Sequence, residues 1–303
     1  MKNVNAGVPD DALALAEPAA HRAGDFFALT KPRLNSLVIV TAGIGYYLGA
    51  ADNLHLPALL QAVIGIALVA GGAAGLNQLY ERDTDSLMFR TRMRPLAAQR
   101  VTPGEALVFS LVLVFVGLGI LAATSNALAA FLALLTVISY NVVYTPMKRR
   151  SQLATLVGAI PGALPPMIGW AAARGALTAE AWALFAIVFV WQIPHFMAIA
   201  WLYRGDFGRA GFPMLPVVEP TGRSTAQQAV LFSLVLVPLS LAPYVLKMSG
   251  PVYGVGAMAG SVALLWLAIS FARDRTDDRA RVLFLGSITY LPLLWGMMIL
   301  DRV

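Results

Sequence analysis

Nine long runs of apolar residues constrain the fold of this 303-residue chain more than any other feature. Each run is about twenty residues long, which is the length that an α-helix needs to cross the hydrocarbon core of a bilayer. The runs do not alternate between apolar and polar residues, as a membrane-spanning β-strand does. They cover residues 34–50, 56–80, 103–123, 125–144, 152–173, 180–202, 225–246, 251–272 and 282–300. The sequence therefore predicts an all-α membrane protein with nine transmembrane helices in one bundle.

The segments outside these runs give no sign of a separate soluble domain. Only 13% of the residues are charged, compared with about a quarter in a soluble domain. We expect residues 31–303 to form one nine-helix domain and residues 1–30 to form a cytoplasmic tail with a short interfacial helix near its end. The tail is acidic and lacks an apolar core, unlike a signal peptide or a transit peptide. The chain contains no cysteine, which excludes disulfides and thiolate chemistry.

The basic residues indicate which way the bundle is oriented. Of the 22 lysine and arginine residues, 19 lie in one alternating set of the segments between the runs. The positive-inside rule then places the N-terminal tail in the cytoplasm and the C-terminus outside. The net charge of +6 fits a cytoplasmic rim that meets anionic lipid better than a surface for nucleic acid. We expect a multi-pass protein of the bacterial inner membrane.

Asn77, Glu81 and Asp85 follow one another at intervals of four residues near the end of the second run. On a helix this spacing places the three side chains on one face. Two carboxylates and an amide offer the oxygen ligands that suit Mg²⁺, which also binds through substrate phosphates. A polar helix end at the interface is the alternative, but Asn77 lies at the membrane edge, where polar side chains are costly and usually functional. We interpret these residues as catalytic metal ligands.

Two basic clusters lie on the same predicted side of the membrane. The first reads RTRMRPL at residues 90–96 and contains Arg90 and Arg94, whose guanidinium groups suit bidentate contacts with phosphate oxygens. The second contains Lys148 and Arg149, after the fourth run. A role in membrane topology explains these charges as well. If they bind a ligand, we expect the three arginines to contact diphosphate and Lys148 to act in catalysis.

Asp206 follows the sixth run in the sequence LYRGDF at residues 202–207, which echoes LYERD at residues 79–83. The echo indicates a second acidic turn that faces the first, with Asp206 as a further catalytic and metal-binding residue. The loop that begins here is about twenty residues long, which is well above the usual loop length. Such long loops often cover a functional site.

His195 is the one histidine inside an apolar run, in the sequence WQIPHF at residues 191–196. A buried histidine needs a hydrogen-bond partner, and we expect Gln192, or the carbonyl that Pro194 leaves free, to fill that role. His195 is then structural, a proton shuttle, or a ligand or contact to haem. The fifth run holds several prolines, so we expect a kinked or broken helix, of the kind that lines a cavity in membranes. These prolines are Pro161, Pro165 and Pro166.

These motifs resemble those of the UbiA superfamily of intramembrane prenyltransferases, and in particular its haem-farnesylating branch. Asn77, Glu81 and Asp85 resemble the superfamily's first aspartate-rich motif, with glutamate where many members carry aspartate. Four other segments are similar to family signatures, and the last two of them point to the haem branch. They are RT-x-x-RPL at residues 90–96, a YT…KR turn at 144–149, WQ-x-PHF at 191–196 and AG-x-PMLP at 210–216. Ala210 stands where the superfamily's second motif commonly has an acid, which leaves the number of Mg²⁺ ions open.

The resemblance implies transfer of a farnesyl group from farnesyl diphosphate to a vinyl group of protohaem IX, with addition of water, to give haem O. Haem would then be a substrate that His195 and Gln192 contact, at the cytoplasmic side of the bundle. The expected partners are the two substrates, membrane lipid and a downstream haem A synthase or oxidase assembly, with no nucleic acid. The implied Mg²⁺ ligands are Asn77, Glu81, Asp85 and Asp206.

Two alternatives remain open on the sequence. A prenyltransferase for an aromatic quinone precursor would use the same fold and the same Mg²⁺ site. A transporter for a small anion or lipid would fit a broken fifth helix and an internal repeat. Transporter sites tend to lie near the middle of the membrane, however, whereas the polar clusters here lie at one rim.

Overall fold

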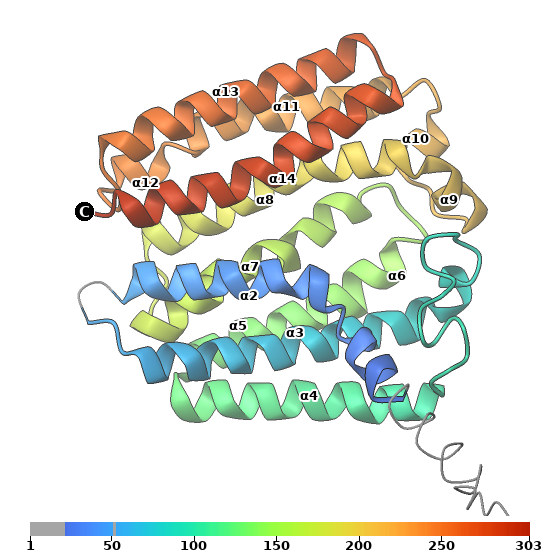
Figure 1. The fold of residues 1–303 in the computed structure, drawn as a ribbon, viewed down its shortest axis with the longest axis horizontal. Helices are drawn as coiled ribbons and strands as arrows, with labels where there is room; N and C mark the ends of the chain where they lie inside the picture. The colour runs from blue at the N-terminus through green and yellow to red at the C-terminus, as the bar shows by residue number, and fades with distance from the viewer. Residues whose placement is uncertain (1–21, 51–52) are drawn as a thin grey trace, which may run out of the picture.

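The computed structural model describes residues 22–50 and 53–303 of the chain. Long helices dominate this part of the chain (Figure 1). Most of the predicted tail lies outside the described residues, but its last part is helical over residues 22–29. The elements that follow are α2 (Pro32–Gly49), α3 (Leu56–Asp85), α4 (Pro103–Thr124), α5 (Ala127–Ile138), η1 (Ser139–Tyr144), α6 (Thr145–Met147), α7 (Ala154–Arg174), α8 (Ala179–Leu202), α9 (Arg204–Arg209), α10 (Leu215–Val218), α11 (Arg223–Leu239), α12 (Ala242–Val245), α13 (Pro251–Arg273) and α14 (Asp277–Leu300).

Eight helical segments of the described chain are long and apolar enough to cross a membrane. They are α3, α4, the combined segment Ala127–Met147, α7, α8, the combined segment Arg223–Val245, α13 and α14. α2, which we predicted as the first of nine spans, is not among them, because its first turns carry Arg33, Asn35 and Ser36. The multi-pass helical bundle is therefore confirmed, with eight candidate spans among the described residues. The ninth span and the orientation of the two termini stay predictions.

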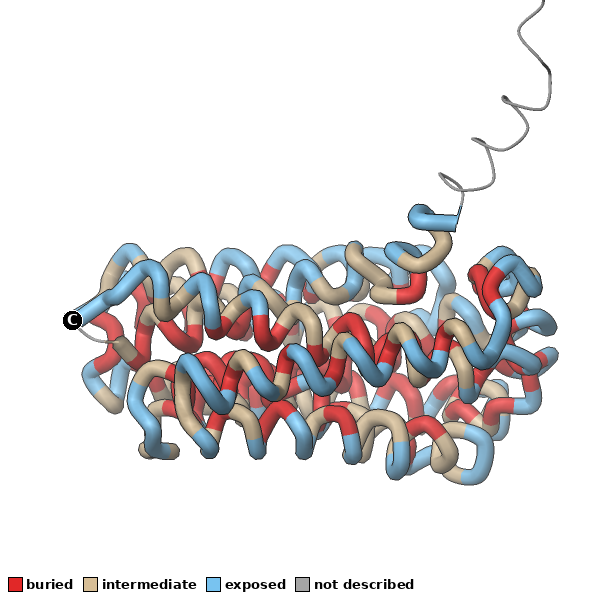
Figure 2. Tube along the Cα trace, turned by 90° about the horizontal axis from the view of Figure 1, so that it is seen from below, coloured by how far each residue is buried: buried red, intermediate tan, exposed pale blue. Residues whose placement is uncertain are grey.

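The outer surface of the bundle is apolar. Large side chains such as Phe115, Val255 and Trp266 are between 63% and 73% exposed on the outward faces of α4 and α13. Figure 2 shows exposed residues along the outside of the bundle and buried residues in its interior. A soluble protein rarely exposes so much contiguous apolar surface. Side chains of this kind are stable when they face lipid, as in a multi-pass membrane protein.

We predicted a kinked or broken fifth helix, and the break is wrong because α7 is one continuous helix. Its prolines lie inside the helix and are buried. A membrane helix can contain proline because neighbouring helices satisfy the backbone groups that lose a hydrogen bond. α7 packs closely along α2 because glycines face the contact. A Cβ atom at Gly45 would overlap the carbonyl oxygen of Pro166, and one at Gly169 would overlap that of Ala42. This contact fixes the second half of α2 against α7.

The loop between α3 and α4 and the segment that contains α9 and α10 lie at the same end of the bundle. In Figure 1 this end is opposite the C-terminus. The two segments pack against each other through one small hydrophobic cluster, which consists of Met88, Phe207, Ala210, Phe212 and Met214. The predicted acidic turns after α3 and α8 are therefore neighbours in space.

Candidate active site

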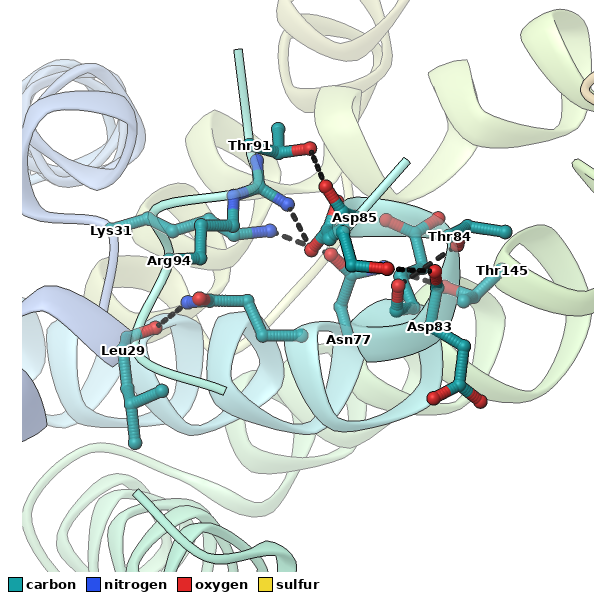
Figure 3. Close-up of polar contacts among 12 residues, drawn as sticks. Leu29, Lys31, Asn77, Asp83, Thr84, Asp85, Thr91, Arg94 and Thr145 are labelled. Carbon is teal, nitrogen blue, oxygen red and sulfur yellow. Dashed lines mark hydrogen bonds and ion pairs between the residues drawn. The ribbon is translucent and has the colours of Figure 1, made fainter. Parts of the chain in front are cut away.

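Asn77, Glu81 and Asp85 lie on one face of α3 in its last turns, and each is at most 5% exposed. The spacing of four residues predicted this shared face. Asp83 lies on another face, where its side chain is 78% exposed. Figure 3 shows Asn77 and Asp85 among the polar contacts at this end of α3, with the carboxylate of Asp83 pointing away. We refer to Asn77, Glu81 and Asp85 as the α3 row.

Each member of the α3 row accepts a hydrogen bond from a cation that another segment supplies. The pairs are Lys31 Nζ with Asn77 Oδ1 at 2.6 Å, Lys148 Nζ with Glu81 Oε1 at 3.0 Å, and Arg94 Nη1 with Asp85 Oδ2 at 2.7 Å. Two buried carboxylates would be costly without such partners. Three cations around two carboxylates leave an excess of positive charge, which suits an anionic ligand.

Lys31 is a member of this group that sequence reasoning missed, because we counted it only among the charges of the tail. It directly precedes α2 and has the left-handed backbone angles φ 48° and ψ 58°, which are uncommon for a residue with a side chain. Burial, and next the charge of Arg94, lower the pKa of Lys31 from 10.5 to about 7. Its place before Pro32, at the predicted cytoplasmic rim, was the available signal.

Asp85 has one carboxylate oxygen without a hydrogen-bond partner. Oδ2 accepts the hydrogen bond from Arg94, whereas Oδ1 is buried and unpartnered among the described residues. Buried polar atoms are normally hydrogen-bonded, and an exception calls for a specific explanation such as an ion. Glu81 lies one helical turn away and adds a second carboxylate. The α3 row therefore fits Mg²⁺, which prefers such oxygen ligands.

The segment before Lys148 holds Asn77 of the α3 row in place through Thr145. Thr145 Oγ1 accepts a hydrogen bond from Asn77 Nδ2 at 3.1 Å and donates one to the carbonyl oxygen of Tyr140 at 2.8 Å. The π-helical turn η1 lies between α5 and α6, and such turns often occur at functional sites. Lys148 Nζ also lies 4.6 Å above the ring of Phe212, so the long loop after α8 reaches the site.

Three other predicted site residues, Arg90, Asp206 and Arg149, make no hydrogen bond or ion pair with the α3 row in the described part of the chain. Arg90 lies 4.6 Å above the ring of Tyr203 and so links the two loops. Asp206 forms an ion pair with Arg209. Within the ranges that the structure describes, no group of three histidine, aspartate or glutamate side chains is placed so that it could hold a metal ion. Arg149 is exposed. The assignments of Asp206 and of Arg149 stay predictions.

The hydrogen-bond partner that we predicted for His195 is wrong. Gln192 donates to the backbone oxygens of Ala159 at 3.2 Å and Val188 at 3.0 Å, and so fastens α8 to α7. Instead, His195 Nδ1 lies 2.8 Å from Ser287 Oγ on α14. Ser287 is far away in the sequence and belongs to no motif that we recognised, so no sequence signal pointed to it.

Comparison with known proteins identifies the family of this chain. The sequence matches the UbiA prenyltransferase family over residues 37–291, which is most of the chain. The chain belongs to the UbiA prenyltransferase family. The resemblance inferred from the motifs is thereby confirmed.

Two similar relatives of this UbiA prenyltransferase are both named protoheme IX farnesyltransferase. The protein from Solibacter usitatus (strain Ellin6076) is 47% identical over 287 residues, which cover 92% of this chain and 98% of the relative. The protein from Koribacter versatilis (strain Ellin345) is 44% identical over 289 residues, which cover 92% of this chain and 93% of the relative. The similarity thus extends over nearly the whole bundle.

Solved structures of UbiA proteins share the fold. A digeranylgeranylglyceryl phosphate synthase matches with a TM-score of 0.78 at 16% identity, covering 93% of this chain and 98% of that one. A UbiA homolog from Archaeoglobus fulgidus bound to GPP and Mg²⁺ matches with a TM-score of 0.62 at 17% identity, covering 91% and 99%. At these identities the likeness shows the common helical architecture alone.

Proposed function

We propose that this UbiA-family chain transfers a farnesyl group to protohaem IX. The observation that carries the proposal is the 47% identity, over 92% of the chain, to a protein named protoheme IX farnesyltransferase. The bond between farnesyl C1 and the diphosphate breaks, and the terminal carbon of a haem vinyl group bonds to C1. Water adds to the other vinyl carbon and loses a proton. The products are haem O and diphosphate.

The α3 row is our proposed site for the diphosphate end of the substrate. Asn77, Glu81 and Asp85 would hold Mg²⁺, an assignment that the unpartnered Oδ1 of Asp85 supports. Bound Mg²⁺ stabilises the negative charge of the leaving diphosphate. The Archaeoglobus fulgidus homolog bound to GPP and Mg²⁺ supports the same combination of ligands within the family. We retain Asp206 as a further ligand supplied by the second loop.

The cations around the α3 row would bind the diphosphate oxygens. Lys31, Arg94 and Lys148 each donate a hydrogen bond to one member of the row, and an arriving diphosphate offers them stronger acceptors. Their movement to the diphosphate would leave the carboxylate oxygens available to a cation. Arg90 and Arg149 are exposed at the same end of the bundle and would make the outer diphosphate contacts.

We place the haem acceptor beside His195, near the contact between α8 and α14. Gln192 has both of its N–H groups on backbone carbonyls, so its Oε1 atom would have to make the proposed haem contact. The location that we propose is the inner membrane of a bacterium, with the site facing the cytoplasm. The position of 19 of the 22 basic residues on one side of the predicted topology supports this orientation.

An acceptor assay with the purified protein tests the proposal. The protein is incubated with farnesyl diphosphate, Mg²⁺ and either protohaem or hydroxybenzoate, and released diphosphate and prenylated product are both measured. We expect Mg²⁺-dependent diphosphate release in step with farnesylation of protohaem, and no product from hydroxybenzoate. A prenylated hydroxybenzoate would favour the quinone-precursor alternative, and no diphosphate release with either acceptor would contradict the enzyme assignment.

A further inference from the structure

The imidazole ring of His195 is stacked with two aromatic rings and contacted at one edge. It stacks with Trp191, with ring centres 5.2 Å apart and planes at 20°, and with Phe284, at 5.0 Å and 26°. At its edge, Nδ1 lies 2.8 Å from Ser287 Oγ. A histidine that served only to fill space would not need a fixed ring plane and a fixed edge at once.

The contacts of Ser287 favour one of the two neutral tautomers of His195. Ser287 is fully buried, and its Oγ donates to the backbone oxygen of Phe284 at 2.7 Å. A serine hydroxyl has one proton, so with that proton directed to Phe284 the same oxygen accepts the hydrogen bond from His195 Nδ1. A neutral imidazole has a single N–H, and with that proton on Nδ1 the other nitrogen, Nε2, carries a lone pair.

The other ring nitrogen of His195, Nε2, is unpartnered among the described residues and is not completely enclosed. It makes no hydrogen bond within the described ranges, and it is not among the buried atoms that lack a partner. Trp191 is fixed by the same residue of α14, because its Nε1 donates to the backbone oxygen of Ser287 at 2.9 Å. One serine thus orients two aromatic side chains that lie one turn apart on α8.

We infer that Ser287 is a positioning residue that keeps the proton of His195 on Nδ1 and so presents Nε2 as an axial ligand to the iron of the haem substrate. This inference rests on the proposed function, because that function supplies the haem. A histidine ligand commonly donates its second N–H to a polar partner, and loss of that partner weakens metal binding by about 10- to 100-fold.

Titration of the purified protein with ferric protohaem tests the inference, with metal-free protoporphyrin IX as the second probe. Ser287→Ala removes the hydroxyl but keeps the backbone oxygen that binds Trp191. We expect this variant to bind ferric haem about 10- to 100-fold more weakly and metal-free porphyrin as well as the wild type does. Ser287→Thr restores a hydroxyl and should recover haem binding. Equal haem affinity in Ser287→Ala and the wild type, or an equal loss for both probes, would overturn the inference.

A matched control and a second measurement protect the test from a folding artefact. Ser261 on α13 is also fully buried, and its hydroxyl bonds to a carbonyl of its own helix, so Ser261→Ala should bind haem normally. In the unaltered protein, ¹⁵N NMR of the three histidines, with His195→Gln for assignment, should show a protonated Nδ1 and an unprotonated Nε2. The opposite tautomer would overturn the inference.

Measuring haem affinity and farnesyl transfer in the same preparations distinguishes failure of the inference from failure of the proposed function. If the protein transfers farnesyl groups and neither Ser287→Ala nor His195→Ala changes its affinity for haem, His195 is not an axial ligand, but the proposed activity is supported. Histidine-ligated haem, weakened by Ser287→Ala, without any farnesyl transfer would support the ligand and refute the activity.

Discussion

Asp85 and Asp83 lie two residues apart on α3 in opposite environments. Asp85 is 1% exposed and carries the unpartnered Oδ1 atom, whereas the side chain of Asp83 is 78% exposed. We predict that Asp85→Asn lowers kcat by about 100- to 1,000-fold, because it removes a charge that would hold the metal at the leaving group. Asp83→Asn should leave kcat within about twofold, since surface substitutions change little.

The measurement is steady-state diphosphate release by both variants, with thermal unfolding in detergent to confirm that each is folded. A normal kcat for Asp85→Asn, or an equal loss in both variants, would rule out the α3 row as the metal site.

Lys31 offers a second contrast, with Arg33 two residues away. Lys31 Nζ bonds to Asn77 within the site, whereas Arg33 is exposed. A hydrogen bond to a charged group contributes about 1.5–3 kcal/mol, so Lys31→Gln should raise the KM for farnesyl diphosphate about 10- to 100-fold. Arg33→Gln should leave that KM unchanged. Initial rates at varied farnesyl diphosphate would decide, and equal KM values in the two variants would exclude Lys31 from the diphosphate site.

The sequence predicted those site residues whose relation is local, and it missed those whose relation is not. The α3 row was predictable because residues four apart share a face on any helix. Lys31 and Thr145 meet Asn77 from 46 and 68 residues away, and Ser287 meets His195 from 92 residues away. Only the packing of the bundle brings such pairs together, so no local pattern could reveal them.

At the scale of elements, the contact between α2 and α7 depends on glycine. A methyl group at Gly169 would overlap the backbone oxygen of Ala42, which cannot move without shifting α2. We predict that Gly169→Ala destabilises the protein by about 1–3 kcal/mol, as overpacking commonly does. Gly119, on the exposed face of α4, has open space around it, so Gly119→Ala should be neutral. Thermal unfolding of both variants in the same detergent is the check, and equal stability would refute this close contact.

Apolar length predicted the positions of the long helices to within a few residues, because the hydrocarbon core imposes that length on every span. The prolines of the fifth run misled the prediction. A proline kinks or breaks an isolated helix, but α7 is buried among neighbouring helices, and its packing against them keeps it continuous. The turn η1 was also unexpected, since a single added residue in a helical turn has no clear signature in the sequence.

For the whole molecule, the arrangement of basic residues predicts a cytoplasmic site. The chain has no cysteine, so single cysteines can report the side of the membrane without a background. Arg150 and Lys247 are both exposed and belong to opposite predicted sides. With a membrane-impermeant maleimide on intact spheroplasts, Lys247→Cys should be labelled at once and Arg150→Cys only after permeabilisation. The reverse pattern would place the site outside.

The central claim is that the buried end of α3 serves farnesyl transfer to haem. Its most direct test is to express the chain in bacterial membranes that lack this activity, extract the haems and weigh them by mass spectrometry. We predict a haem heavier than protohaem by one farnesyl group and one hydroxyl group, present with the wild type and with Asp83→Asn and absent with Asp85→Asn. Unmodified protohaem as the sole haem in cells that express the folded wild-type protein would contradict the claim.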